Sequence, residues 1–174
     1  MTPRPTNNTT VILAAAKDDL LDLIKKLPCM DEYGPEAAQD LLEELLRTLP
    51  FHMSDDGYAI AKSLEEGRLL ITLNFPDVEE LDNIHGILRN ARNKAIADWV
   101  KTEGIAVPYA KDQWLLFKHG TGVVKGMVKA VDTVHAHMVL FCPTLGHRPT
   151  SGTTGLYVNV EDIIGPTEPE AVTV

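Results

Sequence analysis

The sequence predicts an α+β protein, in which a helical N-terminal part with about four helices and one strand precedes a small antiparallel β-barrel. Apolar residues recur at helical spacing through the first hundred residues. From Ile105 onward, valine, aromatic residues and glycine replace leucine and glutamate, as is typical of short strands and turns. We therefore divide the chain into an extended arm at 1–10, a helical part at 11–104, a barrel at 105–165 and a tail at 166–174.

Four amphipathic helices are predicted from the spacing of their apolar residues. They lie at 11–27, at 35–49, where leucines form a broad stripe, at 58–64, and from Pro76 to Gly104. A proline or a glycine ends each of them: Pro28, Pro50, Gly67 and Gly104.

A strand at 68–75 is predicted within the helical part, because Leu69, Ile71, Leu73 and Phe75 recur at every second position. A single strand leaves backbone hydrogen-bonding groups without partners. We therefore expect it to pair with the C-terminal sheet or with a second chain.

The strands of the barrel are predicted at 114–118, 123–131, 134–142, 156–160 and 163–164. A three-residue turn at 132–134 would set Lys129 opposite His137 and Lys125 opposite Phe141. The same turn gives one inner face: Val124, Gly126, Val128, Ala130, Ala136, Met138, Leu140 and Cys142.

The segment at 123–132 places Lys125 and Gly126 ahead of alternating valines. Together with 138–141 and 155–164, it resembles the Src-homology-3-like small barrels of the KOW kind, which occur in ribosomal and transcription proteins. This resemblance implies a fold and does not by itself imply a function.

The chain has 174 residues and a net charge of −9, and its charge is unevenly distributed. Residues 1–106 hold 11 basic and 19 acidic side chains, residues 107–150 hold 5 and 2, and residues 151–174 hold none and 4. An acidic body repels polyanions, so we do not expect a nucleic-acid footprint over the whole protein. The basic segment supplies a cationic and aromatic strip suited to phosphate or to an acidic partner, our candidate binding site: Lys118, Lys125, Lys129, His135, His137 and Phe141.

Two other chemistries are considered in this segment. His135 and His137 lie two residues apart on one strand face, at a spacing that suits one metal ion. Cys142 and His147 follow, and would supply the thiol and imidazole of a hydrolase. Two histidines do not complete a metal site and Cys142 has inner-face parity, so we assign no metal, no cofactor and no catalytic residue.

We predict a non-catalytic interaction and assembly protein, either a structural adaptor of viral or bacterial kind or an acidic inhibitor, that binds a protein partner or a second copy of itself. It would act through the barrel and the extended termini. The strand at 68–75, the Pro- and Thr-rich termini and the long connection at 143–155 favour this function. The alternatives are a regulatory nucleic-acid-binding module that uses the lysine strip, and a small metal-dependent or thiol hydrolase.

The location of the protein is predicted from two features. No apolar run reaches the length of a membrane helix, so we expect no membrane partner. The two cysteines, Cys29 and Cys142, lie far apart in the sequence and in no metal or redox spacing. We therefore expect reduced thiols and a cytoplasmic protein.

Overall fold

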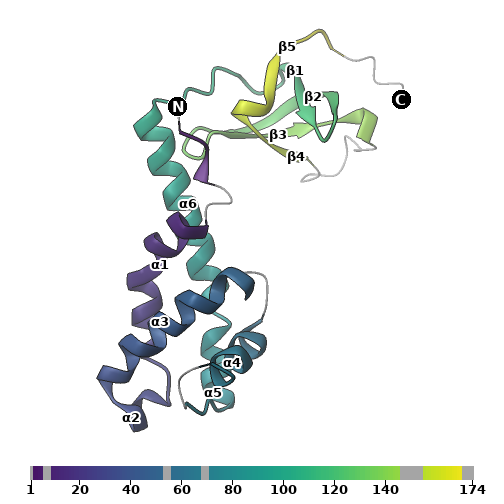
Figure 1. The fold of residues 1–174 in the computed structure, drawn as a ribbon. Helices are drawn as coiled ribbons and strands as arrows, with labels where there is room; N and C mark the ends of the chain where they lie inside the picture. The colour runs from purple at the N-terminus through teal and green to yellow at the C-terminus, as the bar shows by residue number, and fades with distance from the viewer. Residues whose placement is uncertain (1, 6–8, 53–55, 68–70, 146–154, 170–174) are drawn as a thin grey trace. The chain divides into compact units, whose positions relative to one another are not determined.

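The computed structural model shows an α+β fold with helices followed by an antiparallel sheet (Figure 1). The chain forms two compact units: Pro3–Ile96, and Ala97–Val174 together with Met1–Thr2. The structure describes residues 2–5, 9–52, 56–67, 71–145 and 155–169.

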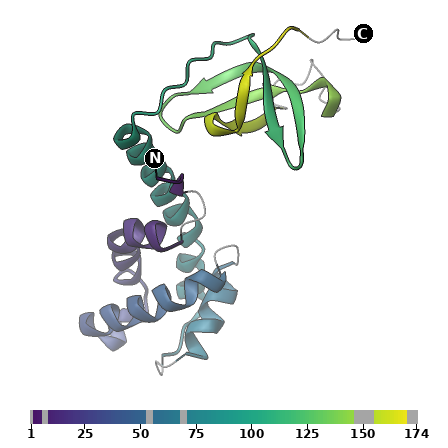
Figure 2. The same cartoon turned by 45° about the horizontal axis from the view of Figure 1, so that its top comes forward.

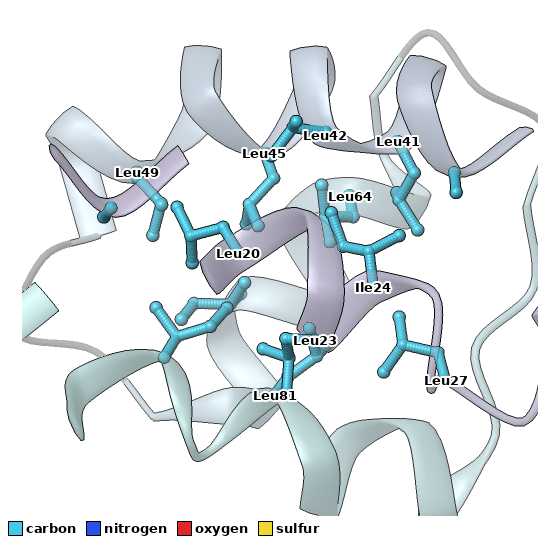
Figure 3. Packing of buried hydrophobic residues seen from close by; sticks show 14 of the residues in the cluster. Leu20, Leu23, Ile24, Leu27, Leu41, Leu42, Leu45, Leu49, Leu64 and Leu81 are labelled. Atoms are coloured by element: carbon cyan, nitrogen blue, oxygen red, sulfur yellow. The ribbon is translucent and has the colours of Figure 1, made fainter. Parts of the chain in front are cut away.

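The described residues contain six α-helices: α1 (Thr9–Ile24), α2 (Met30–Tyr33), α3 (Pro35–His52), α4 (Gly57–Glu65), α5 (Phe75–Leu81) and α6 (Ile84–Glu103). The apolar stripes of the helices meet in one leucine-rich core (Figure 3). Ten of its members, each at most 6% exposed, are Leu20, Leu23, Ile24, Leu27, Leu41, Leu42, Leu45, Leu49, Leu64 and Leu81. The helices predicted at 11–27, 35–49 and 58–64 are therefore found, although α1 ends at Ile24 and Pro28 does not end it.

The long helix predicted from Pro76 to Gly104 is two helices, α5 and α6, separated by Asp82 and Asn83. Aspartate and asparagine favour helix ends because their side chains compete for nearby polar groups. Here Asp82 Oδ1 accepts a hydrogen bond from the backbone N–H of Gly57 at 2.7 Å, and Asn83 donates from its amide to Glu80 at 3.3 Å. These contacts account for the break.

The predicted ends of two shorter helices are also corrected. Helix α3 continues through Pro50 to His52, so this proline lies in the last turn. Helix α4 ends with Glu66 in a right-handed conformation, and Gly67 does not have the positive φ expected of a left-handed stop.

The strand predicted at 68–75 is not found where the structure describes this segment. Residues 71–74 lie in no regular element, and α5 begins at Phe75; residues 68–70 lie outside the described residues. Side chains satisfy the backbone donors in place of a neighbouring strand: Thr72 N–H donates to Tyr33 Oη at 3.1 Å, and Leu73 N–H donates to Glu65 Oε1 at 2.9 Å. The segment therefore does not need a strand partner.

The sheet has five antiparallel strands in the order β4-β3-β2-β1-β5 (Figure 2). They are β1 (Trp114–His119), β2 (Gly122–Asp132), β3 (His137–Phe141), β4 (Leu156–Asn159) and β5 (Ile163–Pro166), with a 3₁₀ turn, η3 (Val160–Asp162), before β5. Its core residues are Leu115, Phe117, Val128, Met138, Leu140, Cys142 and Val158. The sheet predicted from the sequence is confirmed, but β4 and β5 remain its two edges and no closed barrel is seen in the described residues.

The register predicted for β2 and β3 is wrong. Asp132 pairs with His137, and Met127 pairs with Phe141, because the turn spans residues 133–136 and a β-bulge lies at Lys129. A bulge inserts one residue and exchanges the two faces of the strand beyond it. Ala130, expected inside, is therefore exposed, while Val131 packs against the core.

Two residues of the predicted N-terminal arm are held in place. Trp99 Nε1 donates to the carbonyl oxygen of Thr2 at 2.9 Å, and the Thr2 hydroxyl donates to Glu103 at 2.6 Å. Pro5 is buried. In the part of the chain that the structure describes, no helix combines the length and apolar character needed to cross a membrane.

Candidate functional site

The predicted lysines lie along strands β1 and β2. Lys118 is exposed on β1, opposite Val123, and Lys125 is half-buried on β2, opposite Leu116. Directly paired residues share a face of the sheet. Lys118 and Lys125 therefore lie on the same face, and the pair Phe117–Val124 separates their two pairs along the strands. We call Lys118, Lys125 and Lys129 the lysine face.

The predicted aromatic residue, Phe141, is buried instead of exposed, at 3% of its surface. Lys129, in the bulge, holds its ammonium group 5.4 Å from the centroid of the Phe141 ring. This distance is within the range of a cation–π contact. Phe141 therefore positions Lys129 and is not itself available as a stacking surface.

A hollow of about 380 Å³ lies between the end of β1 and the edge strand β4. Lys118, His119, Tyr157 and Asp162 are among the residues that line it. Tyr157 is 73% exposed. Its ring centroid also lies 5.4 Å from that of His137, so Tyr157 connects the hollow with the histidines.

The two predicted histidines are brought together with a carboxylate. Asp132 ends β2, His135 lies in the turn and His137 begins β3. Asp132 Oδ2 is 2.8 Å from His135 Nδ1 and 3.7 Å from His137 Nε2. The imidazole rings stack with centroids 6.1 Å apart. We call Asp132, His135 and His137 the turn cluster.

The turn cluster is partly shielded from water, with side chains 24–34% exposed. Partial burial raises the pKa of Asp132, but hydrogen bonds from the His135 side chain and backbone, and the nearby imidazoles, lower it more. The net effect holds the pKa of this carboxyl below its usual value, so Asp132 is an anion at neutral pH.

Asp132 is the functional candidate that the sequence analysis missed. It was interpreted as a turn residue, because aspartate is common in turns and its side chain commonly bonds to the following backbone. That role is real: Oδ1 accepts from the N–H groups of Val134 and His135 at 2.9 and 3.0 Å. The spacing Asp-x-x-His-x-His was the signal that could have shown its second role.

The thiol chemistry considered for Cys142 finds no support. Cys142 is fully buried in the sheet core, and burial raises the pKa of its thiol to about 11. A nucleophilic cysteine needs a lowered pKa and access to substrate. His147, the other residue of that hypothesis, lies outside the described residues.

Comparison with known proteins adds no relative to these observations: no family model, no curated protein and no solved structure matches the chain.

Proposed function

We propose that this chain is a non-catalytic interaction and assembly protein, whose lysine face binds an acidic surface of a second copy. The observation that carries the proposal is the combination of exposed lysines on β1 and β2 with exposed apolar side chains on β2 and β4. Lys118 and Lys129 are exposed, Val123 is 58% exposed and Tyr157 is 73% exposed. Such mixed patches are typical of protein interfaces.

Charge complementarity indicates which surface would bind there. The helical unit, Pro3–Ile96, carries 10 basic and 17 acidic side chains. The sheet unit carries 6 and 8 in all, but its residues 107–150, which include the lysine face, carry 5 and 2. Opposite potentials steer association and disfavour other arrangements. Contact between the lysine face of one copy and the helical unit of the next is heterologous, which generates rings or filaments.

The segment at 71–75 satisfies its backbone within its own chain, so it gives no reason to expect strand exchange. The proposal rests on the exposed side chains of the sheet and on the acidic charge of the helical unit.

We also infer that the sheet is an incompletely closed member of the Src-homology-3-like class. Two features support this inference: the strand order β4-β3-β2-β1-β5, and the single 3₁₀ turn η3 between β4 and β5. Domains of this architecture serve many functions, so the fold is compatible with the proposal without deciding it.

The test is the mass of the full chain in solution, measured by light scattering at 50 and 500 mM salt. We expect a defined oligomer at low salt that dissociates at high salt, because screening shortens the reach of surface charges to well under about 10 Å. The double variant Lys118→Glu with Lys129→Glu should weaken association at least about tenfold.

A matched control changes charge by the same amount elsewhere. Lys101 and Lys111 are exposed lysines that lie outside both the lysine face and the helical unit, and Lys101→Glu with Lys111→Glu should leave the oligomer intact. A salt-indifferent monomer would overturn the proposal. A monomer that binds a single-stranded oligonucleotide, and loses this binding in the Lys118 and Lys129 variant, would also overturn it and would favour the nucleic-acid alternative.

A further inference from the structure

The turn cluster supplies part of the set of ligand atoms that a bound metal ion needs. Its three donor atoms, one from each residue, all lie within 4.8 Å of one another. Ligand atoms bound about 2.1 Å from a tetrahedral zinc ion lie about 3.4 Å apart. The distances from Asp132 Oδ2 to the two histidine nitrogens, 2.8 and 3.7 Å, lie on either side of that value.

The geometry points to a binding site for one divalent transition-metal ion of the zinc type, held by Asp132 Oδ2, His135 Nδ1 and His137 Nε2. Two imidazoles and one carboxylate form a donor set for such ions, with at least one position left for water or an outside ligand. The ion takes the place of the proton between His135 Nδ1 and Asp132 Oδ2, and the His135 ligand is the neutral imidazole that carries its one proton on Nε2.

The backbone around the turn cluster is held in the required shape. Ala136, between the two histidines, has a left-handed φ of +47° although it is not a glycine, and it is fully buried. Its carbonyl oxygen accepts from the N–H of Val160 at 3.0 Å. A strained residue persists only where its surroundings over-determine it, and such residues gather at functional sites.

Asp132 is positioned independently of any ion. Its Oδ1 accepts the two turn N–H groups, so Oδ2 stays directed at the imidazoles. Interactions that fix a ligand in its binding orientation raise metal affinity. The site therefore needs little rearrangement, and its metal binding does not depend on the proposed assembly function.

The test is a calorimetric titration of ZnCl₂ into tag-free, EDTA-treated full-length chain. We expect saturable binding of one ion per chain. His137→Ala should weaken it at least about 100-fold, since even residues that only support a ligand contribute about 10- to 100-fold. His119→Ala, a matched change on β1 of the same sheet, should leave the affinity within about twofold.

Co²⁺ absorption gives a second readout, because its visible bands report coordination by nitrogen and oxygen. Asp132→Asn keeps an oxygen that can accept the turn N–H groups but loses the anionic ligand, so it should fold and lose these bands. Far-UV circular dichroism of each variant separates loss of a ligand from loss of fold.

Two outcomes would overturn the inference. One is the absence of saturable Zn²⁺ binding by the wild type at millimolar metal. The other is Zn²⁺ binding that is equal in wild type, folded Asp132→Asn and folded His135→Gln.

Discussion

Asp77 should be the most sensitive polar position of the helical unit. Its side chain is fully buried, yet it belongs to the short helix α5. Oδ1 accepts the N–H of Cys29 at 2.9 Å, and Oδ2 accepts the N–H of Asn74 at 2.8 Å. The carboxylate therefore closes a capping box and also ties α5 to the start of α2.

The substitution Asp77→Ala removes both acceptors. The buried Cys29 N–H would then lack a partner, which costs about 1–3 kcal/mol, and loss of the helix cap costs about 1 kcal/mol. We therefore expect the free energy of unfolding to fall by about 2–4 kcal/mol. Urea denaturation followed by far-UV circular dichroism measures this loss, and faster amide exchange at Cys29 would locate it.

Glu79→Ala is the matched control, because Glu79 is an exposed carboxylate on the same helix. Its effect should stay within about 0.5 kcal/mol. Asp77→Asn should lie between the two, since an amide keeps one acceptor oxygen. A loss below about 1 kcal/mol in Asp77→Ala, or unchanged exchange at Cys29, would refute the reasoning.

Three further predictions concern other parts of the chain. Gly57→Ala should lower the free energy of unfolding by about 1–3 kcal/mol, because an added Cβ would lie 2.5 Å from the Val78 carbonyl oxygen. Gly86→Ala places its Cβ in open space, so it should raise the free energy of unfolding by up to about 1 kcal/mol in the same urea assay. Burial raises the pKa of Cys142 to about 11, so its thiol should be alkylated far more slowly at pH 8 in native than in unfolded protein. Mass spectrometry after timed quenching measures the alkylation rate, and rapid labelling of the native protein would contradict the prediction. Hydrogen bonds from the Thr2 hydroxyl and N–H lower the pKa of Glu103, so this contact stabilises the fold at neutral pH and is lost as the pH falls below the usual value of 4.5. Thr2→Ala should raise the pKa of Glu103 in a carboxyl NMR titration. An unchanged pKa would exclude the contact.

The secondary structure could be predicted where one local pattern decides it. The stripe at 35–49 and the strand at 114–118 each have one apolar face and clear end signals, and both are found. The segment at 71–75 has a strand-like alternation, but its Ile71 enters the helical core and its N–H groups bond to side chains. Those partners are distant in sequence, so the local pattern could not show them.

The candidate site was predicted in part. His135 and His137 were identified because two histidines at every second position share a strand face. The two imidazoles do come together, but His135 lies in the turn before β3, so a shared strand face is not the reason. The third member, Asp132, could not be assigned a face without knowing the register of β2 and β3. Phe141 was placed on the exposed strip, but Lys129 packs over its ring and it is buried.

The bulge at Lys129 explains why the turn cluster exists. Before the bulge Val128 pairs with Leu140, and after it Ala130 pairs with Val139, so β2 gains one residue relative to β3. Without the bulge, Lys129 would pair with Val139, and Asp132 would lie opposite the buried Ala136 and share the inner face. With it, Asp132 pairs with His137 and leaves the core, while Val131 takes the inner position. The bulge therefore keeps Asp132 opposite His137 despite the extra residue in β2, and deleting Lys129 should leave the donor set in place, because the pairs from Val128–Leu140 to Asp132–His137 would then follow one another directly.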